Sequence, residues 1–168
     1  YSPSSVADYA IMMMLMVLRN IKPMLQRYVG QDYTVAGLQG RELPKLTVGI
    51  LGAGRIGCTV AKHLTGFGCE ILYWSRRPKQ ELQGIAEYVE LQELLQRSDV
   101  LSLHLSANGE TMHFLDRTRI GAMKDGAVLI NTARGTLVDS DALIDALELG
   151  HLGGAGLDVF DGDRSIYY

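Results

Sequence analysis

Hydrophobic residues near the start of the chain recur at helical spacing, and nearly every side of the helix they predict is apolar. The positions that define this pattern are Val6, Ala10, Met13, Met14 and Val17. A helix with so little polar surface is expected to lie buried between layers or between subunits. The spacing of Ser5 and Asp8 fits a capping box at the start of the helix, and Pro23 is expected to end or kink it.

After residue 45 the pattern changes to short apolar runs that alternate with helical segments. The runs predicted as strands are 46–51, 71–74, 88–89, 100–105, 127–131 and 154–159. Helical spacing follows the first, third and fifth of them, and Asp139 can cap the last helix, which stops at Gly150. Because the runs are too apolar for strands with one wet face, we predict an α/β fold: a Rossmann-type, doubly wound parallel sheet with helices on both faces.

Composition narrows the classes of function. The 168 residues suit one domain, and 47% hydrophobic residues with a net charge of −3 exclude bulk disorder and a broad basic surface. The longest apolar run, 9–18, is about half the length that crosses a bilayer. We therefore expect neither nucleic acid nor a membrane as a partner. Cys58 and Cys69 lack metal-ligand spacing, which favours two reduced thiols in a cytoplasmic protein with no metal site.

The segment 52–57 carries the pattern G-x-G-x-x-G between a predicted strand and a predicted helix. Gly52 permits a tight turn, Gly54 lets the backbone approach a diphosphate, and Gly57 lets the helix pack on the strand. A helix that begins here also directs free N–H groups and a partial positive charge at the phosphates. This context predicts a dinucleotide site rather than a plain strand–helix turn.

The end of the second predicted strand bears on the choice of cofactor. NAD sites usually place a carboxylate there for the adenosine ribose, whereas this chain has Ser75, followed by Arg76 and Arg77. Two guanidinium groups could hold a 2′-phosphate. We therefore expect NAD(P) as cofactor, with NADP(H) favoured over NAD(H); the alternative is that the arginines flank the adenine or face solvent.

Four stretches of the sequence together resemble one family: 1–8, 47–57, 131–135 (Asn-Thr-Ala-Arg-Gly) and 156–160 (Gly-Leu-Asp-Val-Phe). The chain is similar to the D-isomer-specific 2-hydroxyacid dehydrogenases, especially the D-lactate dehydrogenase branch that includes the vancomycin-resistance type. The resemblance implies that 1–168 is a nucleotide-binding domain alone, with 1–29 as the interdomain helix and 46–160 as the Rossmann core. The substrate domain and the catalytic His of the family would then lie outside this chain.

The resemblance also implies roles for individual residues. Arg134 takes the place of the arginine that grips the 2-oxo acid, which suits a guanidinium that binds carboxylates bidentately. Asp158 is expected to hold the nicotinamide carboxamide, and Asp163 stands where the family has a Glu that pairs with the catalytic His. His104 is expected beside the cofactor, without a role in proton transfer. The other positions placed along the cofactor are Arg55, Ile56, Leu105, Ser106, Thr111, Thr132 and Ala133.

The implied activity is hydride transfer between NAD(P)H and a small 2-oxo acid, giving a D-2-hydroxy acid, with pyruvate and D-lactate as the expected pair. The apolar, methionine-rich first helix suggests that two copies pair through that face, so we expect a homodimer. This chain alone is expected to be inactive. One alternative is a dinucleotide-sensing binding module of the corepressor type. Another is a different Rossmann enzyme such as an S-adenosylmethionine-dependent methyltransferase, against which Asn-Thr-Ala-Arg-Gly after the fifth strand argues.

Overall fold

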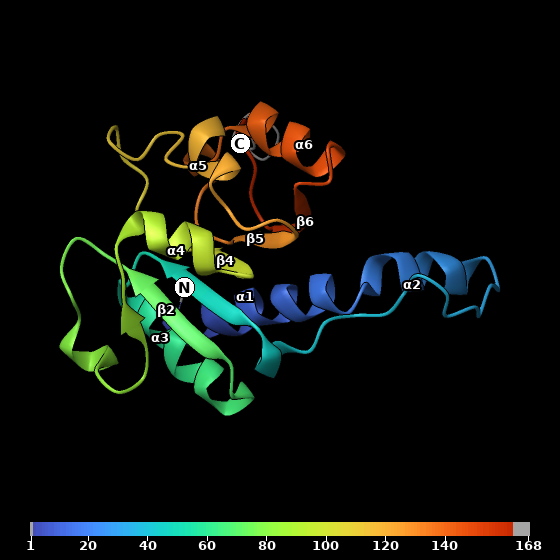
Figure 1. Ribbon diagram of the computed structural model, residues 1–168, viewed down its shortest axis with the longest axis horizontal. Coiled ribbons are helices and arrows are strands. Elements are labelled where there is room, and N and C mark those ends of the chain that lie inside the picture. The colour runs from blue at the N-terminus through green and yellow to red at the C-terminus, as the bar shows by residue number, and fades with distance from the viewer. Residues whose placement is uncertain (1, 163–168) are drawn as a thin grey trace.

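The computed structural model describes residues 2–162, which form a six-stranded sheet flanked by helices (Figure 1). The strands are β1 (Thr47–Leu51), β2 (Glu70–Trp74), β3 (Glu87–Tyr88), β4 (Val100–Leu103), β5 (Ala127–Asn131) and β6 (Leu152–Leu157). They pair in parallel in the order β3-β2-β1-β4-β5-β6. The order reverses between β1 and β4, as in a doubly wound fold, and the predicted fold class is confirmed.

In the described part of the chain, two α-helices precede the first strand and four lie between strands, and most of them are those that the pattern predicted. They are α1 (Pro3–Leu18), α2 (Ile21–Val29), α3 (Arg55–Leu64), α4 (Leu91–Arg97), α5 (Arg117–Gly121) and α6 (Ser140–Glu148). The Asp139 carboxylate accepts a hydrogen bond from Ala142 N and caps α6 as expected. The short α5 was not predicted; its N-terminus is capped by Asp116, which accepts from Arg119 N.

Two hydrophobic clusters lie on opposite faces of the sheet, because successive strand side chains point to alternate sides. Ile50 belongs to the cluster that α1 and α3 cover, whereas Leu51 belongs to the cluster beneath α4, α5 and α6. Both side chains are fully buried. This two-sided burial explains why the strands read as continuous apolar runs rather than alternating ones.

The N-terminal segment differs from its prediction in two details. The Ser5 hydroxyl donates to Ser2 O, and no side chain caps α1, so the expected capping box is wrong. The helix breaks before Pro23, at Asn20, whose φ of 54° is left-handed. Pro23 lies instead in the first turn of α2, where a missing N–H loses no helical hydrogen bond. The predicted interdomain helix over 1–29 is therefore two helices.

Only one side of α1 is buried in this chain. Ala10 and Met14 have no exposed surface, whereas Met12 and Met16 remain accessible on the opposite side. The next helix, α2, has no buried residue and extends with its following loop away from the body as an arm (Figure 1). Among residues 2–162 no single helix is long and apolar enough to cross a membrane; α1 and α2, bent by 65°, reach that length and composition only as a pair.

Candidate functional site

The three glycines of the turn between β1 and α3 differ in how strongly the structure requires glycine at their position. Gly52 has a φ of +104°, and a Cβ there would lie 2.7 Å from the carbonyl carbon of His104. A Cβ on Gly57 would collide with Gly52 O, so this glycine brings the helix onto the turn. Gly54 has an ordinary φ of −78°, and a Cβ on it would meet no protein atom within 4 Å. The fold itself therefore requires two of the glycines, and the third leaves open space.

The beginning of α3 suits a negatively charged group. The N–H groups of a first helical turn have no acceptor within the helix, and no acidic residue lies in this turn of α3. Arg55 is the first residue of the helix and is exposed. Behind the turn, the Cys58 thiol donates to Ala53 O at 3.4 Å, and burial raises the pKa of Cys58 to about 11. A phosphate at this end would meet the positive end of the helix dipole and no competing carboxylate of the first turn.

The loop after β2 presents arginines and no carboxylate. Ser75 is buried, and its hydroxyl donates to Arg77 O at 2.6 Å, which holds a tight turn. Arg76 and Arg77 are both exposed, and Arg76 makes a 3.4 Å ion pair with Glu110 from the loop after β4. The Ser75 side chain therefore organises this loop and leaves both guanidinium groups accessible.

The loop after β4 contains Leu105, Ser106 and Thr111. It starts beside the glycine turn, since His104 N donates to Leu51 O at 2.8 Å. The buried Thr111 hydroxyl donates to Ser106 O at 2.8 Å and braces the loop. Burial lowers the pKa of His104 to about 4, and its Nε2 lies 2.8 Å from the Ser102 hydroxyl. At neutral pH this imidazole is therefore uncharged.

The loop after β5 is held by Asn131, a residue to which the sequence analysis gave no role. Its side-chain amide donates to Arg134 O at 2.9 Å and accepts from Ala133 N at 3.0 Å. The hydroxyl of Thr132, the residue that follows Asn131, is buried and has no hydrogen-bond partner among the described residues. The Arg134 side chain is exposed. A buried hydroxyl without a partner is costly, which fits a position that a ligand completes.

Asp158 lies beside this loop at the end of β6. Its backbone N–H donates to Asn131 O at 3.0 Å, which continues the pairing of β5 and β6 by one residue. Its carboxylate is exposed and acts on a residue that the sequence analysis did not select, Tyr9 of α1, whose pKa it raises by its negative charge. Asp163, the other acidic candidate, lies outside the described residues.

The predicted positions of residues 2–162 gather at one edge of the sheet because parallel strands share a carboxyl edge. Along this edge Ser75 follows β2, Gly52 follows β1, Leu105 comes shortly after β4, Thr132 follows β5 and Asp158 follows β6. Four strand spacings separate the two ends of the row, about 19 Å. An elongated ligand can lie across the point where strand order reverses, with its phosphates at α3. Fold and site define a dinucleotide-binding domain of the Rossmann type.

Comparison with known proteins places this domain in a family. Residues 11–166 match the family model described as D-isomer specific 2-hydroxyacid dehydrogenase, NAD binding domain. The chain belongs to that family, as its motifs had indicated, and it is an NAD-binding domain. Neither a corepressor-type sensing module nor a methyltransferase is favoured by this membership.

Two relatives and one solved structure give the scale of the similarity. The chain is 46% identical over 168 residues to a D-specific alpha-keto acid dehydrogenase of Enterococcus faecalis, and 36% identical over 169 residues to a D-lactate dehydrogenase of Escherichia coli. Each alignment covers 100% of this chain and 51% of the relative. The structure of D-lactate dehydrogenase from Aquifex aeolicus complexed with NAD and lactic acid is similar with a TM-score of 0.94 and 40% identity, covering 99% of this chain and 50% of that chain. The chain thus spans about half the length of these relatives.

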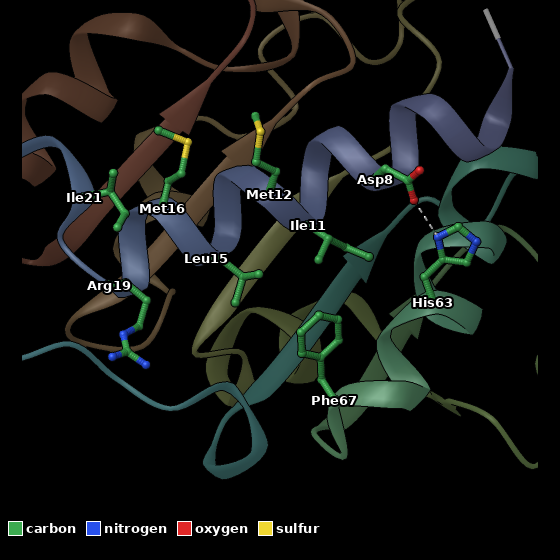
Figure 2. Close-up of a pocket in the computed structure, with 9 residues that line it drawn as sticks. All are labelled: Asp8, Ile11, Met12, Leu15, Met16, Arg19, Ile21, His63 and Phe67. Carbon is green, nitrogen blue, oxygen red and sulfur yellow. Dashed lines mark ion pairs between the residues drawn. The ribbon is translucent and has the colours of Figure 1, made fainter.

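A separate apolar groove of about 470 Å³ lies along the exposed side of α1 (Figure 2). Met12, Leu15 and Met16 line it from α1, and Phe67 closes it from the short turn that follows α3. At one end the Asp8 carboxylate lies 3.1 Å from His63 Nδ1. None of the predicted cofactor positions lines this groove, which makes it a different surface from the dinucleotide site.

Proposed function

We propose that this chain is the cofactor half of an enzyme that reduces a small 2-oxo acid to a D-2-hydroxy acid, with pyruvate and D-lactate as the first pair to test. The nicotinamide supplies the hydride when the cofactor is bound. The observation that carries the proposal is the position of Arg134 at the carboxyl edge, in the same loop as Thr132 and one strand from Asp158.

In this arrangement the residues of the chain bind and orient. The backbone at Gly54 and the first turn of α3 hold the diphosphate, and Asp158 accepts from the carboxamide. Arg134 binds the carboxylate of the 2-oxo acid bidentately and polarises the neighbouring carbonyl. The Asn131 side chain, which bonds to the backbone of Ala133 and Arg134, fixes the loop that carries Arg134. The proton for the product hydroxyl comes from a group outside this chain.

The test uses the protein that contains this domain together with its substrate domain. We expect Arg134→Lys to raise the KM for pyruvate and to lower kcat, because a single ammonium cannot bind a carboxylate bidentately. Unchanged kinetics would remove Arg134 from the proposal. The 168-residue chain by itself should bind cofactor and show no reduction of pyruvate; clear turnover would mean that a proton donor lies within it.

We also infer a preference for NADP(H) over NAD(H). The support is the pair of exposed guanidinium groups after β2 and the lack of a carboxylate at Ser75. In calorimetry, 2′,5′-ADP should bind more tightly than 5′-AMP, and Arg76→Ala should remove most of the difference. Lys79→Ala, a few residues farther along the chain, is the matched control. Equal affinities of the wild type for both ligands would refute this preference and leave the rest of the function intact.

A homodimer through the α1–α2 face is a further part of the proposal. On the arm, Tyr28 is 63% exposed and Val29 is 83% exposed. Neighbouring apolar side chains that are exposed to this degree are typical of a contact surface with another protein. A second copy supplies matching apolar surface, because its own groove along α1 is lined by Met12 and Met16. Sedimentation should give a dimer for the wild type and a monomer for Met16→Lys. A monomeric wild type would refute this part.

A further inference from the structure

Glycines in β6 reveal how closely α1 lies on this edge strand. A Cβ on Gly154 would come within 2.8 Å of Val17 Cγ1, and a Cβ on Gly156 would come within 3.3 Å of Met13 Cε. Glycine at both positions therefore lets the helix rest directly on the strand. Val17 lies at Gly154, and Met13, one turn earlier in the helix, lies at Gly156. The helix and the strand therefore run in opposite directions.

This packing continues in register to the end of the strand. Residues 154, 156 and 158 point to one face of the sheet, and residues 17, 13 and 9 lie on one side of α1, four positions apart. Four helical residues advance about 6 Å, and two strand residues advance about 6.6 Å, so the two repeats match. The next pair in the series is Tyr9 and Asp158.

The electrostatics of Tyr9 agree with this pairing. The charge of Asp158, then burial, and then a hydrogen bond to the same carboxylate all raise the pKa of Tyr9. A tyrosine phenol is protonated at neutral pH in any case and can act as a donor, and the direction of the shift is the one expected for a phenol beside a carboxylate. Tyr9 is 43% exposed, so the residue is not part of the buried core.

We propose that Tyr9 is a positioning residue for the dinucleotide site: its phenol donates a hydrogen bond to the Asp158 carboxylate and holds that carboxylate in the orientation that accepts from the nicotinamide carboxamide. This inference rests on the proposed function, which places the carboxamide at Asp158. A carboxylate has about four acceptor positions, so the bond from Tyr9 leaves acceptors free for the ligand. Without the phenol, the exposed carboxylate can turn away from the site.

The experiment compares three ligands by calorimetry with the 168-residue chain. NAD+ carries the carboxamide, 3-acetylpyridine adenine dinucleotide replaces its NH2 by a methyl group, and ADP-ribose lacks the nicotinamide. We expect Tyr9→Phe to weaken NAD+ binding about five- to tenfold, the size of one ordinary hydrogen bond, and to leave the affinity for ADP-ribose within about twofold. The preference of the wild type for NAD+ over the acetylpyridine analogue should shrink in Tyr9→Phe, as it should in Asp158→Asn.

Tyr28→Phe, on α2 and outside the site, is the matched control and should leave all three affinities unchanged. If Tyr9→Phe keeps the wild-type preference for NAD+, or weakens all three ligands equally, the positioning role is wrong although the dinucleotide site stands. If the wild type binds NAD+ no better than ADP-ribose, the positioning role is wrong, because Asp158 then makes no contact with the nicotinamide that strengthens binding. If the wild type binds none of the three, the proposed function fails together with the inference.

Discussion

The two edges of the sheet treat polar groups in opposite ways. At the amino edge, the Asp99 carboxylate is almost fully buried and accepts hydrogen bonds from Thr47 N, Arg41 and Lys124 at 2.9–3.0 Å. At the carboxyl edge, the Thr132 hydroxyl is buried without a partner, and Arg134 and Asp158 are exposed. One edge is therefore satisfied by the protein itself, and the other is left for a ligand to complete.

The amino edge also connects parts of the chain that are distant in sequence. Arg41, which precedes β1, bonds to Asp99 before β4 and to Gly126 O before β5. Burial alone would raise the pKa of Asp99, but the hydrogen bond from Thr47 and the charges of Lys124 and Arg41 outweigh it, and this pKa is lowered. The difference teaches that a protein accommodates a buried polar group by pairing it, and that a buried polar group left unpaired indicates function.

The largest effect is expected at the amino edge. Asp99→Asn removes the charged acceptor that Thr47 N, Lys124 and Arg41 share and should lower the free energy of unfolding in urea by about 3 kcal/mol, the upper end for hydrogen bonds to a charged group. NAD+ affinity of the folded fraction should not change. The matched control is Asp125→Asn, which removes an exposed carboxylate from His151 at the same edge and should hardly affect stability. A loss of NAD+ binding by folded Asp99→Asn would break the division between the edges.

The second effect separates two glycines of one turn. Gly54→Ala should keep the free energy of unfolding within about 1 kcal/mol, because no protein atom lies near its Cβ, yet weaken NAD+ about tenfold, or about 1.4 kcal/mol. Gly57→Ala should lower both, since its Cβ collides with Gly52 O. Urea titration and calorimetry on the two variants check this. Unchanged affinity in Gly54→Ala would mean that no diphosphate lies against the turn.

The last comparison is a pH dependence that distinguishes the two edges and has no effect at neutral pH. His104 has a folded-state pKa of about 4, below its unfolded value near 6.5, so acid favours the unfolded chain. The stability that the neutral imidazole contributes is complete above pH 6.5 and decreases as pH falls towards 4, with a slope of at most about 1.4 kcal/mol per pH unit.

The lowered pKa of Asp99 places its contribution in a more acidic window. That stability is present above the unfolded pKa near 3.9 and is lost as pH falls through the lower folded value. Urea unfolding from pH 8 to pH 3 should therefore show that His104→Asn flattens the curve between 6.5 and 4, and that Asp99→Asn flattens it only below about 4. An effect of His104→Asn confined to the region below pH 4 would contradict this assignment.

Local pattern was sufficient for most of the fold. Each predicted strand of the sheet is present within two residues at either end. For the central strands β1, β4 and β5 the reason is that a strand buried on both faces must be a continuous apolar run. The short α5 escaped prediction since five residues carry too little periodicity. The break at Asn20 was misplaced to Pro23, because a proline in a first helical turn is tolerated and a left-handed Asn has no strong signature.

The sequence by itself determined the class of fold, the glycine turn and the residues that follow each strand, because strand and turn signals are local. Only the tertiary structure decided which of these residues meet and which polar groups remain unpaired. The pairing of Tyr9 with Asp158 spans most of the chain and depends on a helix lying in register on β6. Such contacts arise from packing between distant segments, which no local pattern encodes.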